Sequence, residues 1–441
     1  MKRASRKELF GWAMFDFANS SYTTVIITVV FCIIFPRLIV GDGPEFRLGN
    51  LLWSASISLS YLIVLLTAPL LGAIMDYTGA KKKFLLGSCW LCALATAALY
   101  FVGPGDILAG MLLIIVSNIG FSYSEAFISS FLPGLGPSRD LGKISGYAWG
   151  LGYFGGLTST AIVIFGLGAG VYTLGNFSNL RLVGPATGLF FLIAAIPTFL
   201  WVRERTVARA LPQNETYFSL GVKRLKKTFL DIRDYRDLTV LLASFFFAYA
   251  GLSIVIAFAF IYGDQIIRWS ATTQILMFVI TQITAAGGAF LFGMLQDTWG
   301  AKRTFILTLL LWVTAVSLIY GVAPVTAWAN GLLGTTLKEE HFFLLIGSIA
   351  GLGLGSTQSA CRAMVGLFSP DTKAGEFFGL WSLTSRLSAI AGLMGLGLLQ
   401  TLFGLHKAIL VCSVFFFIAV VIVWFVDEER GKRTARSHAG E

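Results

Sequence analysis

The chain has 441 residues, of which 56% are hydrophobic and only 13% carry a charge. A soluble protein of this length needs about a quarter of charged residues for its surface, so this composition excludes an ordinary soluble enzyme. The formal net charge is +10, but the basic residues lie in short segments between long apolar runs, which argues against a nucleic-acid partner. We therefore predict an integral membrane protein whose main partner is the lipid bilayer.

Twelve apolar runs are long enough to cross a hydrocarbon core of about 30 Å, which takes about 20 helical residues. Because backbone polar groups in lipid must bond to each other, we predict helices rather than strands, and an all-α polytopic fold. In chain order the predicted spans are residues 10–36, 50–75, 84–102, 106–129, 144–168, 186–203, 238–262, 272–296, 304–323, 341–365, 377–402 and 407–426.

The distribution of basic residues predicts the orientation of these spans. With the N-terminus inside, the cytoplasmic segments hold 25 Lys and Arg residues, whereas the opposite side holds six. Because short cytoplasmic loops carry an excess of Lys and Arg, we expect both termini in the cytoplasm. In a bacterium the membrane would be the inner membrane.

The longest connection divides the chain into two halves. We expect a six-helix bundle at 1–203, a cytoplasmic linker at 204–237, a second bundle at 238–426 and a cytoplasmic tail at 427–441. Within the linker, apolar and basic residues alternate at helical spacing, which suits an amphipathic helix on an anionic leaflet. A solvated linker with chance periodicity is the other interpretation. The apolar positions are Val222, Leu225, Phe229 and Ile232.

Asp16 is the first ionisable residue inside a predicted span, and Asn19 and Tyr22 follow it on the same segment. A charge at membrane depth is costly, so it needs a function or a partner. One interpretation is a site for a proton or a substrate ammonium group. The other is a structural anchor at the cytoplasmic end, capped by Lys143 or by a helix terminus.

Glu125 and Arg362 occupy matching positions in the two halves, since each lies eight residues before a proline, Pro133 or Pro370. Repeats that are related by a pseudo-two-fold axis place such residues opposite one another. We expect either that the two side chains pair across a central cavity, or that Glu125 carries a proton and Arg362 tunes its pKa. Local bonds within each half are the alternative.

Arg386 lies near mid-depth in the eleventh predicted span, where its planar guanidinium suits a carboxylate or phosphate. Structural ion pairing is the alternative interpretation. Asn118 and Tyr249 are further candidates for the lining of a cavity. The residues that we expect along the substrate or proton pathway are Asp16, Asn19, Tyr22, Glu125, Gln282, Gln358, Arg362 and Arg386.

A short sequence that follows the second span is repeated 221 positions later, and both copies read G-x-x-x-D-x-x-G-x-K-[KR]. Its glycines permit close packing and a tight turn, and its aspartate can accept bonds from a helix N-terminus. We interpret it as a conformational latch that holds the halves together on the inside; simple topology-setting charges are the alternative. The residues are Gly72, Asp76, Gly79, Lys81, Gly293, Asp297, Gly300 and Lys302.

This duplication resembles the major facilitator superfamily of secondary transporters, and further motifs narrow the resemblance to its vacuole-effluxer branch. The string from Gly11 to Tyr22, GWAMFDFANSSY, is similar to the opening of that branch, and matches continue at Phe131–Pro133, Ser145–Gly150, Gln358–Arg362 and Phe377–Arg386. The resemblance implies two pseudo-symmetric six-helix bundles and alternating access. It also implies efflux of small amino-acid-like metabolites, driven by protons or by the solute's own gradient.

Other functional classes receive less support from the sequence. The five cysteines lie in apolar segments and the three histidines are scattered, so we expect no disulfide framework, metal or cofactor. No P-loop or hydrolase motif accompanies the spans, so we expect no catalytic residues. Two alternatives to a metabolite effluxer stay open: an exporter of drugs or lipophilic compounds, and a non-transporting assembly helper on the same fold.

Overall fold

The computed structural model describes residues 4–41, 47–170, 172–205, 216–230, 235–370 and 373–437. All regular elements in these ranges are helical, which confirms the predicted all-α class. Eleven helical segments of the described residues are long and apolar enough to cross a membrane. The remaining predicted span, 377–402, lies within a continuous 30-residue helix.

The first half contains six spanning segments, of which the first, Arg6–Val40, is assembled from several helical pieces. The second spanning helix carries Pro69 in its interior, and the last one carries Pro197. The α-helices of this half are α1 (Arg6–Ser21), α2 (Phe31–Ile34), α3 (Arg47–Thr78), α4 (Lys81–Ala98), α5 (Ile107–Ser129), α6 (Leu141–Ala161), α7 (Phe177–Leu180) and α8 (Val183–Trp201).

The second half repeats this order after the connecting helix α9 (Tyr217–Leu230). Two of its helices were not predicted: one lies between the third and fourth spans, and the other follows the last span. The helices are α10 (Arg236–Tyr262), α11 (Ala271–Trp299), α12 (Ala301–Tyr320), α13 (Val322–Leu333), α14 (Glu339–Phe368), α15 (Ala374–Phe403), α16 (Leu405–Ala408), α17 (Leu410–Trp424) and α18 (Glu428–Ser437).

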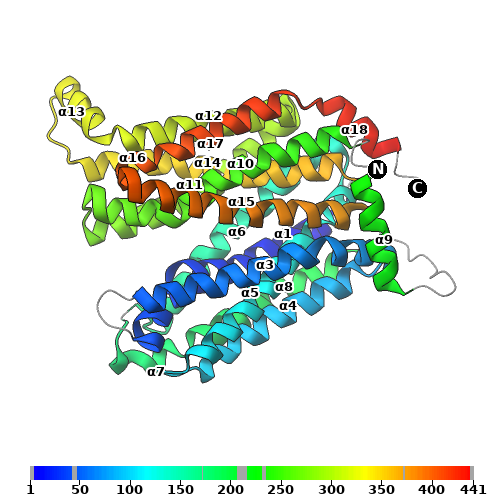
Figure 1. Cartoon of the computed structure of the whole chain (residues 1–441), viewed down its shortest axis with the longest axis horizontal. Helices are drawn as coiled ribbons and strands as arrows, with labels where there is room; N and C mark the ends of the chain where they lie inside the picture. The colour runs from blue at the N-terminus through cyan, green and yellow to red at the C-terminus, as the bar shows by residue number, and fades with distance from the viewer. Residues whose placement is uncertain are drawn as a thin grey trace.

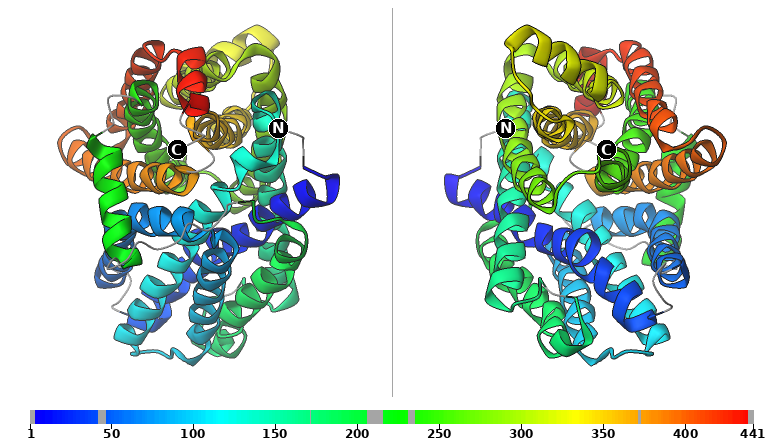
Figure 2. Two further views of the ribbon diagram at one scale, coloured as in Figure 1. Left: turned by 90° about the vertical axis from the view of Figure 1, so that its right-hand side faces the viewer. Right: turned by 90° about the vertical axis from the view of Figure 1, so that its left-hand side faces the viewer.

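The two halves form two bundles that lie one above the other in Figure 1 and run along a common axis. Helices α9 and α18 lie at one end of this axis, which we call the α9–α18 face, and α7 and α13 lie at the other. The end-on views of Figure 2 show the helices of each bundle grouped around their own centre. The repeated turns follow the C-terminal ends of α3 and α11, and these ends lie at the α9–α18 face.

Small residues set how closely the bundles approach each other. Helix α3 packs on α15, and α6 packs on α11, so each half contributes one helix to each of these seams. A Cβ atom at Gly293 of α11 would lie 2.6 Å from the carbonyl oxygen of Gly142 of α6. Such backbone-to-backbone contact needs glycine, as in tightly packed membrane helices.

Helix α9 occupies most of the predicted amphipathic segment and packs against α3. Leu220 and Gly221 are buried, and a Cβ at Gly221 would touch the side chains of Leu70 and Ile74. Phe218 and Lys226 are exposed. Ile232, which belongs to the predicted apolar face, lies outside the described residues. The contact of α9 with an anionic leaflet stays a prediction.

Candidate functional site

The first copy of the repeated turn joins the two halves through Asp76 at the end of α3. Its Oδ2 atom accepts a hydrogen bond of 3.1 Å from the backbone N–H of Glu376, in the first turn of α15. Its Oδ1 atom lies 3.3 Å from Nζ of Lys81, and both side chains are almost fully buried. A carboxylate at a helix N-terminus is stabilised by the helix dipole, so Asp76 fastens α15 to the first half.

The second copy places Asp297 of α11 against the N-terminus of α6. Its two carboxylate oxygens accept hydrogen bonds of 2.9 Å from the backbone N–H groups of Gly142 and Lys143. Two orphan donors of α6 are thereby satisfied by a residue of the other half. Both aspartates therefore act between the halves, as the latch interpretation requires, and both contacts lie toward the α9–α18 face.

The turn glycines and lysines of the two copies differ more than the sequence suggests. Gly79 and Gly300 both have positive φ angles, 62° and 96°, which a residue with a side chain rarely adopts. Lys81 pairs with its own Asp76, but Lys302 does not approach Asp297. Its Nζ atom instead donates to the carbonyl oxygens of Trp424 and Val426 at 2.6 and 2.8 Å. Lys302 thus ties α12 to the end of α17 within its own half, and its part in the latch stays a prediction.

A polar cluster at the rim of the first half, which we call the first clamp, connects the start of α1 to the end of α8. Glu8 is buried and accepts from the backbone N–H of Arg203 at 3.0 Å and from both terminal nitrogens of Arg205 at 2.7 and 2.8 Å. The neighbouring Glu204 accepts from the backbone N–H groups of Lys81 and Lys82 at 2.9 and 3.1 Å. Three spanning segments are thus joined at one rim.

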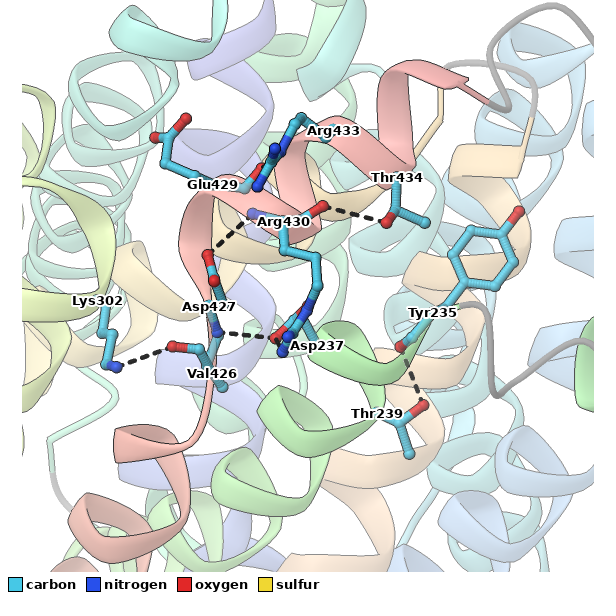
Figure 3. Close-up of polar contacts among 10 residues, drawn as sticks. All are labelled: Tyr235, Asp237, Thr239, Lys302, Val426, Asp427, Glu429, Arg430, Arg433 and Thr434. Atoms are coloured by element: carbon cyan, nitrogen blue, oxygen red, sulfur yellow. Dashed lines mark hydrogen bonds and ion pairs between the residues drawn. The ribbon is translucent and has the colours of Figure 1, made fainter.

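The second half contains an equivalent cluster, the second clamp, which Figure 3 shows. Asp237 of α10 accepts from the backbone N–H of Asp427 at 2.7 Å and from two nitrogens of Arg430 at 2.6 and 2.8 Å. Glu428 accepts from the backbone N–H of Lys302 at 2.9 Å, as Glu204 does from Lys81. The clamps were not predicted, although acidic and basic residues directly after the sixth and twelfth spans were a visible signal.

Asp16 and Arg362 form a buried ion pair between the halves. Oδ2 of Asp16 in α1 lies 2.6 Å from Nη1 of Arg362 in α14. The guanidinium also donates to the hydroxyl and the carbonyl oxygen of Ser145 at 3.2 Å, and it lies 4.8 and 5.1 Å from the ring centroids of Trp12 and Trp149. These cation–π contacts and hydrogen bonds compensate for the cost of burying the charge.

Glu125 and Arg386 form a second ion pair between the halves. Oε2 of Glu125 in α5 lies 2.7 Å from Nη2 of Arg386 in α15. This pair is the more accessible one, since the Glu125 side chain is 25% exposed and that of Arg386 13%. Tyr61 covers the guanidinium with its ring at 4.7 Å, and Nε of Arg386 has no hydrogen-bond partner among the described residues.

The expected pairing of Glu125 with Arg362 is therefore wrong, because each residue has a different partner. The reason is the packing of the helices: α5 lies against α15, whereas α14 lies against α6 and brings Arg362 to α1. The proposed capping of Asp16 by Lys143 is wrong as well, since the backbone N–H of Lys143 caps Asp297. Local pairing within each half, the alternative for Glu125 and Arg362, also fails.

The remaining predicted pathway residues are scattered around these pairs. Tyr22 and Asn118 bond within the first half, to Ser117 at 2.9 Å and Ser60 at 2.6 Å, so we see them as packing residues. Gln358 accepts a hydrogen bond from Tyr153 across the seam of the halves. Gln282 lies beside α6 and is partly exposed, and Oδ1 of Asn19 is buried without a partner among the described residues.

The environment of the two arginines is mainly aromatic, and the sequence analysis missed it. The ring of Tyr249 lies 6.3 Å from that of Trp381, and this pair borders Cys361. Tyr61, Trp12 and Trp149 complete the surroundings through the cation–π contacts given above. No group of three or more His, Cys, Asp or Glu residues that could hold a metal occurs in the described part of the chain.

Comparison with known proteins gives relatives over the full length of the chain. The "Uncharacterized MFS-type transporter YxiO" of Bacillus subtilis is 28% identical over 438 residues, which cover 97% of this chain and 96% of that protein. "Autophagy-related protein 22-1" of Penicillium rubens is 25% identical over 451 residues, covering 86% of this chain and 75% of that protein.

Solved structures of similar fold are transporters of low sequence identity. A bacterial homologue of the iron transporter ferroportin, in its outward-facing state, has a TM-score of 0.69 at 14% identity and covers 95% of this chain and 98% of its own. The proton:xylose symporter XylE has a TM-score of 0.68 at 14% identity, with coverage of 98% and 97%. These similarities show the fold of the major facilitator superfamily.

The match to a family description covers most of the sequence. Residues 52–436 match the family described as "Vacuole effluxer Atg22 like". This range includes both copies of the repeated turn, Glu125, Arg362 and Arg386. The chain is thus a multi-pass membrane protein of the major facilitator superfamily, and it belongs to the vacuole effluxer Atg22-like family of transporters.

Proposed function

We propose that the protein exports small amino-acid-like solutes by alternating access between its two bundles. The observation that carries this proposal is the set of contacts between the halves. Two helix-capping aspartates lie toward the α9–α18 face, and two ion pairs lie further along the bundles. All four are polar contacts, whose partners can be replaced by water or by a polar solute as the halves separate.

The latch is the part that we expect to open toward the α9–α18 face. Breaking the Asp76 and Asp297 caps frees the N-termini of α15 and α6, and the two helix pairs α3–α15 and α6–α11 can then separate. We place this face in the cytoplasm, because the predicted pattern of spans assigns 25 loop and terminal Lys and Arg residues to the segments on one side of the membrane and six to the other, and the two repeated turns belong to the richer side. In a bacterial cell the protein would lie in the inner membrane.

The Glu125–Arg386 pair is our candidate for the substrate site. A zwitterionic solute can replace each partner, its carboxylate binding Arg386 and its ammonium group binding Glu125, so no charge is left unpaired. The free Nε donor of Arg386 gives the carboxylate a second hydrogen bond with fork geometry. The family description as effluxers supports export as the direction.

Proton coupling is an extension of the same proposal. Glu125 is the partly exposed acid of the pair, so it can gain a proton from a water-filled pathway and release Arg386. Protonation would then favour one conformation because the ion pair exists only when Glu125 is charged. Asp16 is almost fully buried against Arg362, and we assign it a structural role between the halves.

Export of lipophilic compounds is the second candidate, because the Tyr61 ring covers the Arg386 guanidinium and Tyr249 lies close enough to interact with its charge. Mainly aromatic surroundings with few charges are typical of sites for larger apolar anions. A non-transporting helper is disfavoured, since its charges would have no reason to be partly exposed at the seam of the halves.

The test is counterflow in proteoliposomes with a panel of labelled amino acids, related zwitterions and lipophilic anions, with and without a pH gradient. Wild-type protein should exchange at least one zwitterion, and Glu125→Gln and Arg386→Ala should each abolish that exchange. Arg386→Lys keeps the charge but loses the fork, so it should weaken binding more than folding. Lys407→Gln, at an exposed and peripheral position, is the matched control.

Four outcomes separate the alternatives. Exchange of lipophilic anions alone supports the second candidate, and full activity of Arg386→Ala removes α15 from the site. Export that is equal with and without the pH gradient contradicts proton coupling but leaves the substrate assignment intact. A wild-type protein that is folded and exchanges none of the panel contradicts the proposed substrate class.

A further inference from the structure

A groove of about 380 Å³ runs between α3, α4 and α5 near the α9–α18 face. Its walls are almost entirely apolar, and they include Leu71 of α3, Leu91 of α4 and Phe127 of α5. Gly87 of α4 is exposed and lines the groove, and a Cβ atom at this position would have no other atom within 4 Å. This position therefore has room for a larger side chain.

The groove opens on the surface that faces lipid. Leu86, Trp90 and Leu94 of α4 are exposed beside it, and such large apolar side chains on a spanning helix indicate contact with the bilayer. A small polar solute finds no set of polar partners in this groove. An acyl chain fits its chemistry, because most of the lining is apolar and the hydroxyls of Ser88 and Tyr123 are already bonded to Leu85 and Thr67.

One charged residue, Lys83, lies at the end of the groove, in the first turn of α4. Its side chain is exposed and has no ion pair or side-chain hydrogen bond among the described residues. The other basic residues of this turn, Lys81 and Lys82, are held by Asp76 and by the carbonyl oxygen of Phe199. Lys83 therefore remains available for a partner outside the chain.

Helix α9 adds positive charge on the neighbouring side of α3. It packs on Leu70 and Ile74, next to the groove residue Leu71, and exposes Lys223 and Lys226 together with Phe218. Basic groups combined with exposed aromatic side chains at the ends of spanning helices favour anionic lipid over zwitterionic lipid. The apolar groove and the basic mouth thus point to the same molecule.

We propose that this groove binds an anionic phospholipid, with an acyl chain between α3, α4 and α5 and the headgroup phosphate at Lys83. The site belongs to the first half only. In the second copy of the turn the residue that corresponds to Lys83 is Thr304, which is buried. The proposal depends on membrane location and not on the transported substrate.

The experiment is native mass spectrometry of the purified full chain, titrated with equimolar phosphatidylglycerol and phosphatidylcholine of identical chains. Lys83→Gln should lower the preference for phosphatidylglycerol by about five-fold, since one basic residue near a membrane surface has about this effect. Gly87→Leu should fill the groove and reduce retention of both lipids. Gly287→Leu, at a similarly open helix position of the other half, is the matched control.

The folding of every variant is checked by size-exclusion profile and by thermal unfolding without added lipid. Leucine has a higher helix propensity than glycine, so Gly87→Leu should fold at least as well as wild type. Retention unchanged in both Lys83→Gln and Gly87→Leu overturns the proposal. If only the double variant Lys223→Gln/Lys226→Gln loses the preference for phosphatidylglycerol, the lipid binds at α9 and the proposal is overturned. Equal retention of the two lipids by wild type overturns the proposal as well.

Discussion

The two copies of the repeated turn have the same sequence pattern but hold the halves together by different chemistry. Asp76 is fully buried, has Lys81 as a counter-charge and accepts a hydrogen bond from the backbone N–H of Glu376 in α15. Asp297 is only partly buried and reaches across to two backbone N–H groups of α6. The first copy therefore combines a helix cap with a buried ion pair, whereas the second depends on helix capping. A motif that is duplicated in sequence need not be duplicated in energetics.

The largest effect on the distance between the halves should come from substitutions that prevent the close helix contact that both copies need. Gly72→Val places side-chain atoms against the backbone of Gly375, and Gly293→Val does the same against Gly142, so the latch face should be unable to close. Spin labels at Arg139 and Arg303, exposed and on opposite halves, should move apart in both variants. Gly287→Val is the control, and an unchanged label separation in Gly72→Val would contradict the latch.

The next largest effect is a difference between the two aspartates in how much stability each contributes. Asp76→Asn leaves the Lys81 ammonium buried without its counter-charge, which should cost about 3–5 kcal/mol of stability. Asp297→Asn keeps a capping oxygen, so it should cost about 1 kcal/mol or less. The measurement is unfolding of each variant in the same detergent. Equal losses would show that the copies are energetically alike and would refute the comparison.

A double-mutant cycle sharpens the same difference. Asp76→Asn combined with Lys81→Gln should show a coupling energy of about 1–3 kcal/mol, because the two side chains contact each other. Asp297→Asn combined with Lys302→Gln should be additive to within about 0.5 kcal/mol, since these side chains have separate partners. Strong coupling in the second cycle would mean that Lys302 belongs to the latch after all.

The smallest effect concerns pH and the second clamp. Burial alone would raise the pKa of Glu428, but the backbone N–H of Lys302 and the Lys432 ammonium outweigh it and hold the pKa below its usual value. The charged form therefore stabilises the fold above the ordinary glutamate pKa of about 4.3, and this contribution is lost as pH falls through the lowered value. Wild type should lose more stability than Glu428→Gln on acidification below about pH 5. Parallel pH profiles would exclude Glu428 as the cause.

The sequence predicted the architecture well because bilayer thickness and hydrophobicity decide the positions of the spans. The predicted second span, 50–75, lies within α3, and the spans around Glu125 and Arg362 match α5 and α14. The helix-capping contacts of Asp76 and Asp297 also followed from local chemistry, since an acid at the end of one helix needs donors and the start of another supplies them. Their role as a latch stays a prediction.

The partners of the charged residues could not be predicted in the same way. Symmetry suggested that Glu125 and Arg362 face one another, but ion pairs depend on which helices touch at a given depth. That contact is set by glycines such as Gly142 and Gly293, whose effect on helix distance has no signal in hydropathy. The aromatic contacts of Arg362 with Trp12 and Trp149 depend on rotamers and helix rotation, which a periodic pattern does not specify.

The clamps have a consequence for how the polypeptide can be assembled. The first clamp closes between Glu8 and Arg205, and the second between Asp237 and Arg430, so each clamp joins spans of one half only. The latch, the two ion pairs and the packing of α9 on α3 join the halves without a covalent bond. A break in the chain between Arg205 and Thr216 therefore leaves two finished bundles, which can be synthesised as separate polypeptides and meet by recognition within the membrane.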